Sequence, residues 1–377
     1  EIHFLSFGTS LKMARVLIAM LGFLSPSLAR AESVCVTGAG GFVAQEIVAQ
    51  LLEGGFEVHG TVRSLAKTEV VQPLRDMAKA IGKGKLVLHE ADLIVEGAFD
   101  ECIAGRDFVM HTASVFNLAV EDIERDLIEP AIRGTYNVLR SVNRTASVKR
   151  TVLTATYCSI WSFCGSEAWE CPREQRPKNG EAFTEDDWAT TLYPDGGLAY
   201  KGSQAYCRSK VEQDKAAREF ADHNGLDLVT IHPALVVGPP RGPRDDGVSM
   251  YIMKAFAAGS LVHQVFPHGD IRDVALAHIM AAMIPEASGR YIVSGPHIPT
   301  DHEMWTCLKQ AYPSMELGSE PNVAEPHWMR TSSKRTEELI GRALTPLCKS
   351  WVDAIGTIIQ KGYAVNAGLK ENLKSEL

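Results

Sequence analysis

A glycine-rich turn between a strand and a helix constrains the fold of this chain more than any other feature. Residues 33–37 form a short apolar run, typical of a strand buried in a parallel sheet. The pattern T-G-x-x-G-x-x-A follows at once, with Gly38, Gly41 and Ala44 at the key positions, and then a helical pattern begins. A second strand is expected at 56–62. The order indicates a βαβ unit.

Glycines at this turn allow the backbone to approach a pyrophosphate closely, and the helix N-terminus stabilises its negative charge. The alternative is an ordinary glycine turn. Because the motif stands between a strand and a helix, we predict a dinucleotide site. Its expected residues are Thr37, Gly38, Gly40, Gly41, Phe42 and Val43.

The end of the second strand indicates which dinucleotide binds. NAD sites place a carboxylate there for the ribose hydroxyl, whereas NADP sites place arginine against the 2′-phosphate. Arg63 stands at this point and Lys67 follows, with no carboxylate between them. Arginine binds phosphate with paired, charge-assisted hydrogen bonds. We therefore predict NADP(H), the alternative being that both cations are solvated surface charges.

Strands continue to alternate with helices beyond this unit. Further strands are expected at 85–89, 108–113 and 150–154, with a helix at 127–142. The alternation predicts an α/β fold with a doubly wound parallel sheet, which binds cofactors at the carboxyl ends of its strands. Asp92 could equally cap a helix. The residues expected on this rim are Asp92, Leu93, Thr112, Ala113 and Thr156.

Tyr206 and Lys210 are spaced four residues apart in a helical pattern that continues through Phe220. This spacing puts both side chains on one face of a helix. A nearby ammonium is expected to lower the pKa of the phenol, as general acid–base chemistry requires. Such a pair is often structural, and here the preceding dinucleotide motif favours the catalytic interpretation.

Together these segments resemble the extended short-chain dehydrogenase/reductase superfamily, within the NAD-dependent epimerase/dehydratase family. The group that they resemble most contains dihydroflavonol, cinnamoyl-CoA and aldehyde/ketone reductases. The resemblance covers roughly 33–362 and implies a Rossmann fold with a smaller C-terminal substrate-binding lobe. It rests on the glycine motif, Thr61-Val62-Arg63, the T-x-T of 154–156, Tyr206 to Lys210, the segment 232–239 with Pro233, the segment 270–278 and the segment 332–341.

The resemblance also implies residue roles. Tyr206 would protonate the substrate carbonyl, Lys210 would lower its pKa and contact the cofactor, and Thr156 would hold the carbonyl where most members have serine. Trp161 replaces a polar residue that holds the ring in flavonoid-reducing members, so a different aldehyde or ketone is expected. Trp161 and Ser114 are the expected substrate contacts.

Two alternatives to a carbonyl reductase remain. One is a nucleotide-sugar epimerase/dehydratase or a hydroxysteroid dehydrogenase on the same scaffold. The other is a non-catalytic NADP-binding sensor or assembly subunit, since folds of this kind also serve for binding alone. Retention of both Tyr206 and Lys210 favours an enzyme.

The length of 377 residues predicts a second lobe beside the Rossmann domain. We expect a leader or extension at 1–32, the NADP-binding domain at 33–237, and at 238–377 mainly a substrate-binding lobe that partly returns to the Rossmann core. Four residues could line an apolar pocket, although core packing is favoured for each: Trp188, Met250, Met253 and Phe256.

Composition limits the partners. A formal net charge of −8 argues against broad nucleic-acid binding, and the histidines lack metal-ligand spacing. The apolar run at 16–24 is too short to span a bilayer. We expect a small-molecule carbonyl substrate and a monomer or homodimer.

The eight cysteines are expected as structural thiols rather than metal ligands or redox groups, with Cys35 and Cys207 buried. This fits a reducing compartment, although disulfides are the alternative because the number of cysteines is even. Residues 13–31 have an apolar stretch, no acidic residue and an A-x-A sequence, so a signal or transit peptide competes with an untargeted extension. The expected location is the cytoplasm.

Overall fold

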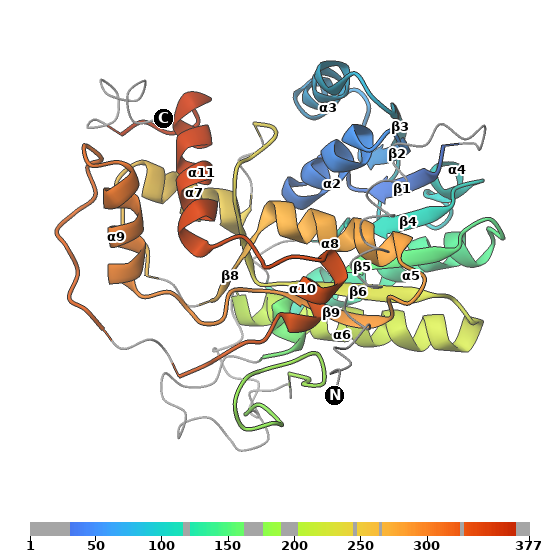
Figure 1. Cartoon of the computed structure of the whole chain (residues 1–377). Helices are drawn as coiled ribbons and strands as arrows, with labels where there is room; N and C mark the ends of the chain where they lie inside the picture. The colour runs from blue at the N-terminus through green and yellow to red at the C-terminus, as the bar shows by residue number, and fades with distance from the viewer. Residues whose placement is uncertain are drawn as a thin grey trace, which may run out of the picture.

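A computed structural model describes residues 31–115, 121–161, 176–189, 203–243, 247–263, 266–324 and 328–366. Nearly all of the expected leader, together with Cys164 and Cys171, lies outside these residues. The described chain alternates strands with helices from Ser33 onwards (Figure 1).

The central sheet contains seven parallel strands among the described residues, in the order β3-β2-β1-β4-β5-β6-β9. The order reverses direction between β1 and β4, which makes this the switch point where such sheets bind ligands. The predicted doubly wound fold is confirmed. The strands are β1 (Ser33–Thr37), β2 (Glu57–Val62), β3 (Lys85–Glu90), β4 (Phe108–His111), β5 (Arg150–Thr154), β6 (Leu228–Pro233) and β9 (Gly289–Val293).

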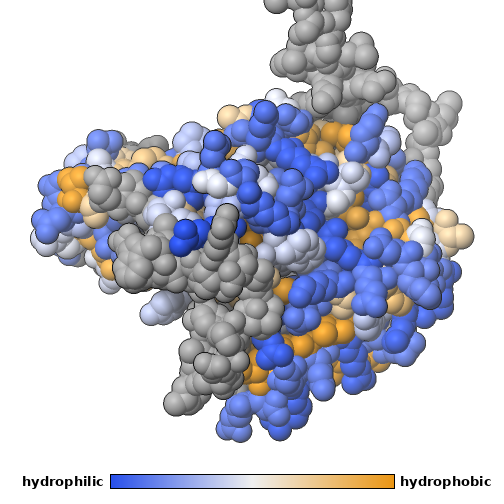
Figure 2. Space-filling view, turned by 90° about the horizontal axis from the view of Figure 1, so that it is seen from below, coloured by the Kyte–Doolittle hydropathy of each residue, from blue (hydrophilic) through white to orange (hydrophobic). Residues whose placement is uncertain are grey.

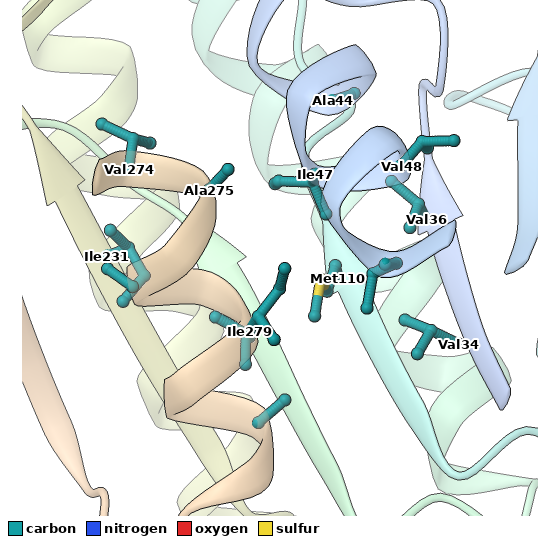
Figure 3. Packing of buried hydrophobic residues seen from close by; sticks show 14 of the residues in the cluster. Val34, Val36, Ala44, Ile47, Val48, Met110, Ile231, Val274, Ala275 and Ile279 are labelled. Atoms are coloured by element: carbon teal, nitrogen blue, oxygen red, sulfur yellow. The ribbon is translucent and has the colours of Figure 1, made fainter. Parts of the chain in front are cut away.

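Helices α2 (Phe42–Glu53) and α8 (Ile271–Met283) cover one face of this sheet (Figure 1). Their apolar side chains meet those of the strands, among them Ile47, Ile279 and Met110 (Figure 3). Burial of such side chains stabilises the fold by about 1.5–3 kcal/mol each. At the margins of this layer lie α3 (Thr68–Ile81) and α10 (Lys334–Ile340).

Helices α5 (Glu129–Asn143) and α6 (Ser203–Asn224) pack together on the opposite face, preceded by the π-helical turn η1 (Glu124–Ile128). Short helix α4 (Asp100–Ile103) lies beside them. After β5 the chain makes a single 3-10 turn, η2 (Tyr157–Ser159), which packs against α6.

A second lobe forms around α7 (Val248–Ala257), α9 (Asp301–Ala311) and α11 (Leu347–Gln360), beside the short parallel pair β7 (Leu235–Val237) and β8 (His268–Asp270). The favoured interpretation, core packing, is confirmed for three of the four candidate pocket residues, which are fully buried in this core because α7 packs its apolar face against α11. They are Met250, Met253 and Phe256.

The cysteines that the structure describes form disulfides, the alternative to the free thiols that the sequence favoured. Disulfides join Cys35 to Cys102, Cys158 to Cys207 and Cys307 to Cys348, and no free cysteine occurs in the described part of the chain. The paired residues are 67, 49 and 41 positions apart and meet only after β1 packs on α4, η2 on α6, and α9 on α11. Sequence spacing alone therefore gave no sign of the pairing. The expectation of a reducing compartment loses its support, because disulfides persist in oxidising ones.

Hydrophilic residues cover most of the described surface in the view from below, with hydrophobic residues in separate areas (Figure 2). Among the described helices, none combines the length and apolarity needed to cross a bilayer. No cluster of described side chains has the composition of a metal site.

Candidate active site

The glycine turn has the conformation that the motif predicts. Gly38 has a φ of +68°, which only glycine adopts readily, and an added Cβ would lie 3.1 Å from the Cα of Ala113. The Gly38 amide donates to Thr61 Oγ1 at 3.0 Å, and the Gly41 amide donates to the Gly38 carbonyl at 2.8 Å. The turn therefore brings the backbones of β1 and β4 close together at the switch point.

Thr37 links the ends of those two strands. Its hydroxyl oxygen accepts from the amides of Thr112 at 3.1 Å and Ala113 at 3.0 Å, and lies 2.9 Å from His111 Nδ1. The Thr112 hydroxyl in turn donates to the Thr37 carbonyl. Three residues predicted for cofactor binding, Thr37, Thr112 and Ala113, are thus brought together.

The start of α2 can receive an anion. Gly41 is its N-cap, Phe42 and Val43 begin its first turn, and no acidic residue stands in that turn. The first amides of a helix lack intrahelical acceptors and favour negative charge. Gly40 is needed for a different reason, since a Cβ there would lie 2.5 Å from Val70 Cγ1.

Arg63 and Lys67 are exposed just beyond β2, on the side where an adenosine 2′-phosphate is expected. Asp92 is also exposed, and its carboxylate accepts from the Ile94 amide at 3.0 Å. The alternative helix-cap role for Asp92 is wrong, because α4 begins only at Asp100. Leu93 is buried against Gly134.

Helix α6 presents the predicted catalytic pair. Lys210 Nζ lies 5.8 Å from the centre of the Tyr206 ring. It donates to Ser114 Oγ at 2.5 Å and to Gln213 Oε1 at 2.8 Å. Ser114, which was predicted to contact substrate, therefore contacts Lys210 in this structure and ties α6 to the end of β4.

The pKa of Tyr206 differs from the expectation. Burial raises the pKa of Tyr206 to about 12, and burial lowers the pKa of Lys210 to about 7, opposed by the charge of Asp214. The expected lowering of the Tyr206 pKa by Lys210 is not found, because the ammonium is directed to Ser114 and Gln213. Tyr206 is thus a neutral phenol at physiological pH. His111 is neutral too, since burial lowers its pKa to about 3.

Thr156 lies half-buried just beyond β5, and its hydroxyl accepts from the Cys158 amide at 3.4 Å. The Cys158–Cys207 disulfide, with Cα atoms 5.2 Å apart, joins the residue two positions after Thr156 to the residue that follows Tyr206, and so brings the two segments together. Trp161 is only 3% exposed and packs near Tyr157 in an apolar cluster. Pro233 is buried at the end of β6.

A buried polar network behind this site was not predicted. His232 Nδ1 donates to the Thr156 carbonyl at 3.0 Å, and Arg290 donates to the Ser159 carbonyl at 2.9 Å. Arg290 also stacks on Trp188, at 3.8 Å from the ring centre, and lies 3.9 Å from Asp214. The sequence offered one sign of this network: Gln213 and Asp214, three and four residues after Lys210, are polar and share its helix face.

Comparison with known proteins places this geometry among reductases. The model of the NAD dependent epimerase/dehydratase family matches residues 34–293. Cinnamoyl-CoA reductase CAD2 of Medicago truncatula is 32% identical over 337 residues, covering 88% of this chain and 97% of that one. Dihydroflavonol 4-reductase of Hordeum vulgare is 32% identical, covering 75% and 76%.

Solved structures similar to this chain also include reductases. Yeast methylglyoxal/isovaleraldehyde reductase Gre2, complexed with NADPH, superimposes with a TM-score of 0.73 at 27% identity, covering 88% of this chain and all of that one. Vestitone reductase of alfalfa gives a TM-score of 0.65 at 26% identity, covering 88% and 99%. A UDP-glucuronic acid 4-epimerase of Bacillus cereus, at 14% identity, shares the fold.

Proposed function

The chain belongs to the NAD dependent epimerase/dehydratase family and is an oxidoreductase of its dihydroflavonol reductase-like group, and from this premise we propose that it reduces an apolar aldehyde or ketone with NADPH. The observation that carries the proposal is the hydrogen bond from Lys210 to Ser114, beside Tyr206. It joins the catalytic helix to the switch-point edge where the dinucleotide turn lies.

The residues of that edge fit NADPH. The amides at the start of α2 suit its pyrophosphate, and Arg63 with Lys67 suits its 2′-phosphate. When bound, the reduced nicotinamide would supply the hydride that adds to the carbonyl carbon.

Proton transfer falls to Tyr206. Its phenol would donate its proton to the carbonyl oxygen as negative charge develops there, with the Thr156 hydroxyl as a second donor. Burial, which raises the pKa of Tyr206 to about 12, keeps the proton on the phenol until it is needed. The Lys210 ammonium would then offset the charge that remains on the tyrosine oxygen.

Position 161 bears on the substrate class, because a bulky indole stands where flavonoid-reducing members have a polar residue, and this favours a substrate without paired ring hydroxyls. The names of the relatives cover aliphatic aldehydes, aromatic thioesters and flavonoids, so they do not agree on one substrate class. We therefore base the proposed substrate class on the residues of this chain. We propose a monomer or homodimer, to be distinguished by sedimentation velocity.

Substitution Tyr206→Phe tests the mechanism. We expect kcat to fall by about 10²- to 10⁴-fold because the acid is lost, while the Kd for NADPH changes less than twofold. Tyr251→Phe is the matched control, since Tyr251 is 70% exposed on α7 and should leave both values unchanged. Unchanged turnover in Tyr206→Phe would rule out this role, and tightly bound NAD in the purified protein would favour the epimerase alternative.

A further inference from the structure

We propose that Gln213 is a positioning residue for Lys210, and that Thr135 on the neighbouring helix fixes the orientation of the Gln213 amide. The proposal rests on the catalytic role proposed for Lys210. It adds two residues that do not touch the reacting atoms but determine where the lysine side chain points.

Gln213 is placed to do this by helix geometry. It follows Lys210 by three residues on α6, so the two side chains share a face. Lys210 Nζ donates to Gln213 Oε1 at 2.8 Å, and the two side chains are only 3% and 2% exposed. Together with the bond to Ser114, this contact defines the direction of a side chain that is otherwise long and flexible.

The hydrogen-bond directions around Thr135 leave the amide one orientation. The Thr135 hydroxyl donates to the Ala131 carbonyl at 2.9 Å, so its oxygen is free to act as an acceptor. Gln213 Nε2 donates to that oxygen at 2.6 Å. A rotated amide would place its NH₂ group against the Lys210 ammonium and its carbonyl against a hydroxyl whose proton is already used. The chain of bonds therefore directs the amide oxygen at Lys210.

The charges that face Lys210 explain why a neutral partner matters. Asp214 follows on α6 but is engaged by Arg218 at 3.1 Å, and His111 on β4 is neutral. Tyr206 is a neutral phenol. Ser114 and Gln213, the hydrogen-bond partners of Lys210 in the described part of the chain, are uncharged, so they orient the amine without holding its proton. This agrees with a Lys210 pKa of about 7.

Charge and shape at position 213 can be separated by substitution. Gln213→Glu places a carboxylate beside the ammonium, which should raise the pKa of Lys210. The pH at which kcat/KM falls on the alkaline side should therefore rise by at least one unit, because Lys210 keeps its proton to a higher pH. Gln213→Met keeps the shape and removes the bond, so kcat should fall about threefold to tenfold while the Kd for NADPH stays within twofold.

Thr135 offers a second, independent variant. Thr135→Val removes the acceptor for Gln213 and should lower kcat in the same direction as Gln213→Met, and Thr135→Ser should restore it. Thr145→Val is the control, because Thr145 lies just beyond the end of α5 and its hydroxyl donates to the backbone carbonyl of Ser141 at 2.8 Å. Should Gln213→Glu fail to fold, the Thr135 series carries the same test.

A readout without turnover keeps this proposal separate from the catalytic one. NMR titration of the full chain labelled with ¹³Cε-lysine, with the Lys210 signal assigned from Lys210→Arg, should give a higher Lys210 pKa in Gln213→Glu than in the wild type. An unchanged titration and unchanged kinetics in the Gln213 variants would overturn the positioning role. A shifted titration with full activity in Tyr206→Phe would instead overturn the proposed reaction mechanism alone.

Discussion

The two faces of the central sheet are built differently. Beneath α2 and α8 the contacts are apolar, with Ile47 and Ile279 packed on the strands (Figure 3). Between α5 and α6 the chain buries amide, hydroxyl and carboxylate groups instead, and two of the disulfides lie on this side. The first face is stabilised mainly by apolar area, although it also buries ion pairs such as Glu46 with Arg241 and Asp273 with Arg342. The second buries a polar network that specifies the direction of particular atoms beside Tyr206 and Lys210.

The largest effect is expected where the second face buries charge. Asp214→Ala should lower the free energy of unfolding by about 3–5 kcal/mol, because Arg218 and Arg290 would lose their buried carboxylate. Urea denaturation measures this, with exposed Asp222→Ala on the same helix as control. Equal losses in the two variants would show that the buried charge network is not what holds this face.

The disulfide beside Thr156 and Tyr206 should have a somewhat smaller effect on stability. The double variant Cys158→Ser with Cys207→Ser should lose about 2–4 kcal/mol, because the unfolded chain regains the freedom of a loop of 49 residues. Denaturation with and without reductant measures the loss, and thiol counting on the denatured wild type checks that the bridge exists. A free thiol at either position in the non-reduced protein would contradict the pairing.

The apolar face should give the smallest effect. Ile47→Val removes one methylene from a fully buried side chain and should lower the unfolding free energy by about 0.5–1.5 kcal/mol. The alkaline limb of kcat/KM should not move, since no polar contact of Lys210 changes. A shifted limb in Ile47→Val would break the distinction between the two faces.

The same division separates what could be predicted from what could not. The βαβ unit, the strand positions and the spacing of Tyr206 and Lys210 are local patterns, and the structure has the expected turn at Gly38 and helix from Ser203. Contacts between segments that are far apart in the sequence leave no periodic pattern of residues by which they could be predicted. Gln213 meets Thr135 only because α5 packs on α6, and Cys35 meets Cys102 only because α4 lies against β1.

An apolar residue has two possible uses, and core packing, the use favoured for Met250 and Met253, is the one that the structure shows. Met250 and Met253 have the character of pocket residues, but α7 turns that side toward Trp351 and the lobe core. Hydrophobicity reports that a side chain leaves water and does not say whether it meets a ligand or another helix.

The bridge between Cys158 and Cys207 has a consequence for how the substrate range of this chain could change. The 49-residue separation spans the stretch between Thr156 and Tyr206, and its ends are covalently joined. The entropic cost of closing a loop rises only slowly with its length. Where residues outside the packed part of this stretch, which includes Phe183 and Trp188, are exchanged, the bridge should therefore hold the segments of Thr156 and Tyr206 together. This makes the stretch a point at which the range of accepted substrates could be redesigned.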